Sequence, residues 1–145
     1  MFVGKIVAIV ILSMALMQGG AEVARAAATA PLEIAEGHLF FAPKRTTLFV
    51  LADIWPNRTS VESISAAERE SLLVTTAIAI AKSLMTKPDM AALDNVRVEF
   101  SYVKNMDEYA RQDFSSMVRH GYVMLARKGA DLAVTESKLD FQPGR

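Results

Sequence analysis

The clearest pattern in the chain is the almost unbroken apolar stretch LLVTTAIAIA at residues 72–81. Ser65 with Glu68 three residues later matches a capping box, and Pro88 marks the far end of the segment. On a helical projection the apolar positions cover about two-thirds of the circumference, more than a surface helix needs. We therefore expect one long helix over residues 65–87, mostly buried against strands of the same chain.

Two other interpretations of residues 72–81 are open. A membrane-spanning helix needs about 20 apolar residues, whereas this stretch is shorter and is flanked by Glu70 and Lys82. A wide apolar arc could also form the seam of a homo-oligomer, so self-association through the helix is an alternative.

Two strands are expected before the helix. HLFFA at residues 38–42 and TTLFVLADIW at residues 46–55 are rich in aromatic and β-branched residues, and Pro43-Lys44-Arg45 separates them. Alternate positions in the second strand are apolar on both sides. This pattern is typical of a central strand or of a strand that is covered on both faces.

Three further strands are expected after the helix. VRVEFSYVK at residues 96–104 alternates between apolar and polar positions, which predicts an antiparallel strand with one wet face. Residues 116–127 resume strand character, and Gly121 within them indicates a bulge or a close backbone approach. Residues 130–141 predict a last edge strand that carries charged side chains.

The order β-β-α-β-β-β predicts an α+β fold, with the long helix packed on a curved antiparallel sheet of four to five strands. Cystatin-like and hotdog-like architectures share this outline. We expect a single globular domain at residues 38–141, an extended lead-in at 27–37 and a loose tail at 142–145.

The N-terminus has the pattern of a secretory signal peptide. Lys5 precedes an apolar run at residues 6–17, and an alanine-rich tract with small residues at the required spacing follows. Cleavage is expected after Ala26, with Ala21 and Ala28 as other frames. A Sec-type peptide at residues 1–26 predicts a bacterial periplasmic or secreted protein without a stable membrane span after cleavage.

Composition excludes several functional classes. The chain has 145 residues, no cysteine and a formal net charge of +0. Disulfides, thiol catalysis and thiolate metal sites are therefore impossible. No basic cluster is longer than two residues, which argues against a nucleic-acid partner.

Catalytic and cofactor motifs are also missing from the sequence. The two histidines, His38 and His120, have no metal-ligand spacing, and no glycine-rich phosphate loop or nucleophile elbow occurs. We expect no metal and no cofactor, and the sequence favours a protein that is not an enzyme. Asp53, inside the most apolar strand, needs either a wet strand end or a partner. Together with His120 it could line a ligand pocket under the helix.

A polar segment at residues 105–114 is the best candidate for a contact surface. It is longer than an ordinary hairpin connection, and long loops are often functional. Tyr109, Arg111 and Phe114 belong to residue types that are enriched at binding hot spots, and Asp107 lies beside them.

Three functions are compatible with these features. The leading hypothesis is an exported, non-enzymatic binding or assembly module that contacts another envelope protein, for example as an accessory to an envelope or secretion machine. One alternative is a small enzyme or ligand carrier with a hotdog-like pocket. The other is a hydrolase inhibitor that presents loops from a rigid sheet.

Overall fold

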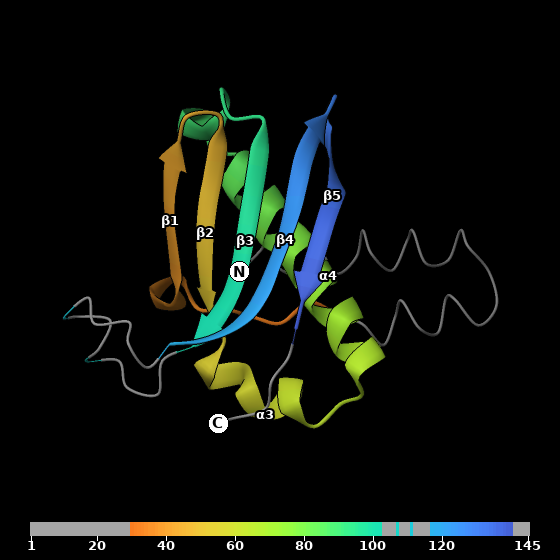
Figure 1. Cartoon of the computed structure of the whole chain (residues 1–145). Coiled ribbons are helices and arrows are strands. Elements are labelled where there is room, and N and C mark those ends of the chain that lie inside the picture. Colours follow the sequence, from red (N-terminus) through yellow and green to blue (C-terminus); the bar gives the residue numbers. More distant parts are fainter. Residues whose placement is uncertain (1–29, 103–106, 108–110, 112–116, 141–145) are drawn as a thin grey trace.

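The structure is a computed structural model that describes residues 30–102, 107, 111 and 117–140 (Figure 1). It has an α+β fold, with a five-stranded mixed sheet in the spatial order β1-β2-β3-β4-β5. The predicted signal peptide at residues 1–26 and the predicted tail at 142–145 lie outside the described residues. The elements in chain order are η1 (Glu36–His38), β1 (Leu39–Lys44), β2 (Thr47–Asp53), η2 (Trp55–Asn57), α3 (Arg58–Glu62), α4 (Ala66–Met85), η3 (Pro88–Met90), β3 (Asn95–Tyr102), β4 (Val118–Lys128) and β5 (Asp131–Leu139).

The expectation of an antiparallel sheet is wrong for one pair of strands. β2 and β3 run parallel, whereas the other three neighbouring pairs are antiparallel. The reason is the helical connection, because α4 carries the chain back along the sheet before β3 begins. β3 therefore starts at the same end of the sheet as β2.

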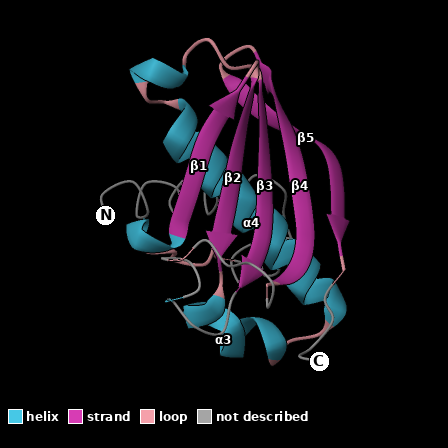
Figure 2. Ribbon diagram, turned by 60° about the vertical axis from the view of Figure 1, so that its left-hand side comes forward, coloured by secondary structure: helices cyan, strands magenta, loops and turns pink. Residues whose placement is uncertain are grey.

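Helix α4 begins and ends close to the predicted positions. The Ser65 hydroxyl accepts a hydrogen bond from the Glu68 backbone N–H at 3.3 Å, and the Glu68 carboxylate accepts one from the Ser65 N–H at 3.1 Å. The capping box is thus confirmed. Figure 2 shows α4 crossing one side of the sheet, and none of residues 72–81 is exposed.

None of the helices in the described part of the chain has the length and apolar character to span a bilayer. The core instead lies between α4 and the sheet. We call the sheet face that packs on α4 the inner face and the opposite one the outer face. Buried side chains of the inner face and of α4 include Leu48, Val50, Ala52, Val96, Val98, Phe100, Val123, Leu125, Leu73, Ala77, Ile80, Ala81 and Leu84.

The segment before β1 is docked onto the domain from residue 30 onward. The Leu32 N–H donates to the Thr76 hydroxyl of α4 at 3.0 Å, and the Asn57 side-chain amide donates to the Glu33 carbonyl at 3.1 Å. Leu32 and Ile34 also pack against the core. These contacts hold the lead-in against α4 and η2.

Strand β1 continues through Pro43, where the sequence suggested a break. The hairpin to β2 is closed by the pair Lys44 and Thr47, which leaves a two-residue turn with Arg45 at φ 58°. The residues that flank such a turn bond to each other, so the next residue, Pro43, directs its backbone nitrogen away from β2. A proline is tolerated there because no ladder hydrogen bond is lost.

β2 is a central strand, but it is covered on one face along most of its length. Leu48, Val50 and Ala52 are buried on the inner face, whereas Phe49 on the outer face is 43% exposed. The expected central position is confirmed, whereas coverage of both faces does not extend to Phe49. No described helix lies over this part of the outer face (Figures 1 and 2).

Gly121 meets both expectations for its position. The register between β3 and β4 shifts here, with Phe100 opposite Gly121 and Ser101 opposite Arg119, so His120 is the extra residue of a bulge. Gly121 has φ +109°, and a Cβ at this position would lie 1.9 Å from the Lys138 carbonyl oxygen of β5. Both the backbone conformation and the space require glycine.

We expect Gly121→Ala to destabilise the fold by about 3 kcal/mol or more, because it combines backbone strain with a clash against a neighbouring strand. The measurement is the urea midpoint of the purified protein. Gly37→Ala is the matched control, since nothing lies within 4 Å of its added methyl group. Equal midpoints for Gly121→Ala and the wild type would contradict this account of the bulge.

Candidate functional site

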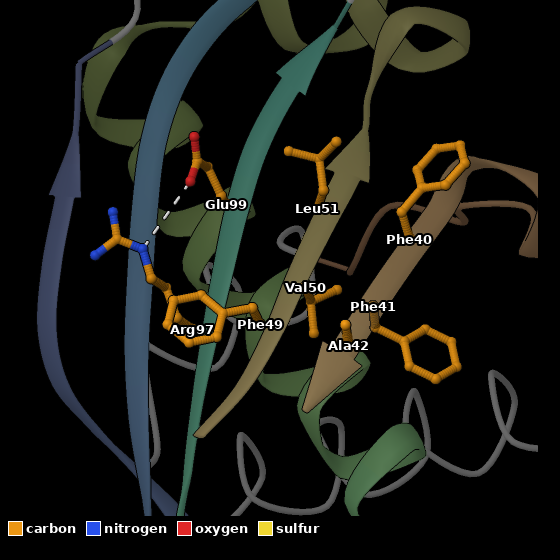
Figure 3. Close-up of a pocket in the computed structure, with 8 residues that line it drawn as sticks. All are labelled: Phe40, Phe41, Ala42, Phe49, Val50, Leu51, Arg97 and Glu99. Carbon is orange, nitrogen blue, oxygen red and sulfur yellow. Dashed lines mark ion pairs between the residues drawn. The ribbon is translucent and has the colours of Figure 1, made fainter. Parts of the chain in front are cut away.

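The outer face of the sheet holds a shallow groove of about 290 Å³ over β1, β2 and β3. Figure 3 shows that its side chains come from these three neighbouring strands. The lining residues are Phe40, Phe41, Ala42, Phe49, Val50, Leu51, Arg97 and Glu99. The groove is therefore apolar along β1 and β2 and charged along β3.

The strand registers explain why apolar and charged residues meet here. Phe40 pairs with Leu51, and Leu51 pairs with Glu99 on the other side. Ala42, Phe49 and Arg97 form the next row in the same way. Because paired residues share a face, these two rows form one continuous surface. Phe40 and Phe49 are large apolar side chains that line the same groove, yet they are 39% and 43% exposed.

A network of polar side chains extends from the groove across β3, β4 and β5 on the outer face. The Arg119 guanidinium lies 3.6 Å from the Glu99 carboxylate, and Arg97 Nε lies 4.0 Å from it. The Arg97 guanidinium also stacks on the Tyr122 ring, 3.7 Å from the ring centroid. The Tyr122 hydroxyl donates to Glu136 at 3.0 Å. These contacts fix the orientation of the charged wall of the groove.

The next row of the outer face is a buried polar pair at the carboxyl end of β2. Asp53 is fully buried, and its Oδ2 lies 2.6 Å from His38 Nδ1. Its other oxygen accepts a hydrogen bond from the Trp55 N–H at 3.1 Å. A carboxylate buried in an apolar strand needs a polar partner, and the partner of Asp53 is His38 at the end of η1. This bond ties the start of β1 to the end of β2.

Ser101 lies beside Asp53 on the neighbouring strand β3. Its hydroxyl is fully buried and has no hydrogen-bond partner within the described part of the chain. His38 and Ser101 flank Asp53 from opposite sides, since β1 and β3 are the two neighbours of β2. The three side chains do not form a serine–histidine–aspartate relay in this arrangement, because the histidine must stand between the other two.

His120 lies on the opposite face of the sheet from Asp53. It lines a cavity of about 400 Å³ between the first turns of α4 and the ends of β4 and β5. Asp53 is not among the lining residues, so the two do not share a pocket. The cavity is lined by Ala66, Ala67, Arg69, Glu70, Leu73, His120, Leu139 and Asp140.

The His120 side chain is shielded from solvent at the base of this cavity. Its burial lowers the pKa of the imidazole to about 4, and the positive charge of Arg69 adds to this effect. Its ring centroid lies 5.2 Å from that of Tyr102, which in turn lies 5.3 Å from that of Trp55. Burial and the Glu62 carboxylate raise the pKa of Tyr102, while Arg58 opposes the shift. His120 is therefore neutral near pH 7 and belongs to an aromatic cluster.

The predicted contact segment is described at two positions. Asp107 and Arg111 are both exposed, and the Arg111 N–H donates to the Asp107 carbonyl at 3.0 Å. Tyr109 and Phe114 lie outside the described residues. The sequence pattern did not identify Phe40, Phe49 and the His38–Asp53 pair as a shared surface, although the apolar outer positions of β2 were a usable signal.

Among the described residues, no group of three His, Cys, Asp or Glu side chains could hold a metal ion. Searches against protein-family models, curated proteins and solved structures found no match for this chain. Its function must therefore be inferred from the geometry of its own surfaces.

We expect the His38–Asp53 pair to be strongly coupled, because it joins a buried carboxylate to its imidazole partner. A double-mutant cycle with His38→Ala and Asp53→Ala, measured by urea unfolding, should give a coupling energy of about 1.5–3 kcal/mol at neutral pH. A cycle between His38→Ala and Lys138→Ala, on the far edge strand, is the control and should give none. A value near zero for the first pair would show that the contact does not stabilise the fold.

We expect acid to destabilise the fold through His120. Its pKa is about 4 in the folded protein and higher when unfolded, so the unfolded state binds more protons as the pH falls from about 6.5 to 4. Stability due to neutral His120 is thus present at pH 7 and is lost across this window. The urea midpoint should fall less in His120→Phe, or in His120→Gln if the first variant does not fold. Parallel pH profiles for variant and wild type would contradict the assignment.

Proposed function

We propose that the protein is an exported, non-enzymatic binding module that docks another envelope protein on the outer face of its sheet. The observation that carries this proposal is the groove around Phe40 and Phe49, which are 39% and 43% exposed. Solvent-exposed aromatic side chains that line one groove are typical of protein-binding surfaces. The signal-peptide pattern at residues 1–26 supports the export part of the proposal.

The surroundings of the groove favour binding over catalysis. The adjacent His38–Asp53 pair holds β1 to β2, and the charged wall is fixed by contacts to Tyr122 and Glu136. A surface that is ordered before binding loses little conformational entropy when a partner docks. Asp107 and Arg111 are exposed, so we include the predicted contact segment at residues 105–114 as a second part of the proposed docking surface.

A second candidate function rests on the cavity at His120. Its volume of about 400 Å³ lies within the range of about 300–1,000 Å³ that small-molecule sites occupy. It lies between helix and sheet, where a hotdog-like outline would place a ligand. The protein would then be a ligand carrier, with neutral His120 as a polar contact. The cavity lining also includes three charged residues, Arg69, Glu70 and Asp140, which favours a polar, hydrogen-bonding ligand over an apolar one.

The docking proposal predicts selective crosslinking from the groove. With Phe49 replaced by p-benzoylphenylalanine, illumination of producing cells should link the protein to one discrete partner, identified by mass spectrometry. Val134 on β5 is the matched control, because it is 40% exposed and apolar but lies outside the groove. Phe40→Ser should reduce the crosslink from position 49. Identical products from positions 49 and 134 would contradict docking in the groove.

A further inference from the structure

The outer face has more cationic than anionic side chains. The whole chain has a formal net charge of +0, so the excess on this face is local. By strand register, five cations share the outer face with four acids, and one of these acids, Asp53, is fully buried against His38. The cations are Lys44, Arg97, Arg119, Lys128 and Lys138, and the other three acids are Glu99, Asp131 and Glu136.

The surplus is concentrated at the charged wall of the groove. Two guanidinium groups, those of Arg97 and Arg119, lie within 4.0 Å of the single carboxylate of Glu99. One carboxylate cannot neutralise both of them. The Arg119 side chain is 70% exposed and extends into solvent, so it is accessible to a carboxylate from outside.

We infer that the partner segment that docks in the groove is acidic and amphipathic. Its apolar side chains pack on Phe40, Phe49 and Leu51, and its carboxylates bind Arg97 and Arg119. Guanidinium–carboxylate bonds are strong and directional, so they would fix the orientation of the segment. This inference rests on the proposed function and adds the chemistry of the partner.

A second copy of the chain fits the groove poorly. A stable dimer buries about 800 Å² on each partner, which a strip of a few half-exposed apolar side chains does not supply. Face-to-face pairing of two copies would also bring like charges together around Arg97 and Arg119. The area and the charge both favour a single acidic segment of another protein.

Three labelled peptides test the inference by fluorescence anisotropy with the purified protein at low ionic strength. They are the acidic apolar peptide ELFELFE, its basic counterpart KLFKLFK and its polar counterpart ESSESSE. We expect ELFELFE to bind about tenfold more tightly than KLFKLFK, and ESSESSE to bind weakest. Added salt should reduce the preference for the acidic peptide.

Variants separate the two proposals. Arg97→Gln with Arg119→Gln should remove most of the preference for ELFELFE, and Arg119→Gln alone serves if the double variant does not fold. Lys82→Gln, which removes a cation of α4 on the opposite side of the sheet, is the control and should leave the preference unchanged. Phe40→Ser with Phe49→Ser should weaken both apolar peptides equally.

Equal binding of ELFELFE and KLFKLFK, or a preference that survives the arginine substitutions, would overturn the acidic partner. If Phe40→Ser with Phe49→Ser still weakens both peptides in that case, the groove remains the docking surface. If these serine substitutions have no effect, the proposed function itself fails. A dimer in analytical ultracentrifugation that Phe49→Ser dissociates would replace the acidic segment with a second copy.

Discussion

The packing of α4 on the inner face of the sheet is the contact on which the rest of the structure depends. The chain has no cysteine, so burial must supply the stability that disulfides add in some other small domains. The same helix forms the connection between β2 and β3 and so determines their parallel pairing. Because α4 covers the inner face, the inner positions of β2, β3 and β4 must be apolar. The outer positions do not contact α4, so their side chains can be polar or can form a binding surface.

The parallel pairing positions the polar residues of the outer face. Parallel neighbours present equivalent positions side by side, so Asp53 and Ser101 lie in one row at the carboxyl ends of β2 and β3. Burial of the Asp53 carboxylate would be costly without a partner, and His38 and the Trp55 N–H offset this cost. The apolar groove and the buried pair are therefore successive rows of the same sheet face. The side chains of Phe40 and Phe49 are exposed to solvent, whereas those of Asp53 and Ser101 are buried.

Much of the fold could be predicted from the sequence, because its signals are local. The capping box at Ser65, the alternation in residues 96–102 and the bulge at Gly121 each depend on neighbours within a few positions. Strand pairing does not, and the antiparallel expectation was wrong for β2 and β3. The candidate site was harder to predict for the same reason. The apolar surroundings of Asp53 in the sequence indicated that its carboxylate needs a partner, but 15 positions separate it from His38. The groove likewise combines residues from three strands.

The position of Pro43 in β1 has a consequence for self-assembly. Among the residues that face away from β2, Pro43 has no N–H, and the N–H of Leu39 is bonded to the Glu36 carbonyl. Phe41 is left as a single donor along this border of the sheet, too few to template a growing cross-β stack. β1 can therefore expose aromatic side chains without promoting the fibre formation to which an unprotected edge strand is prone.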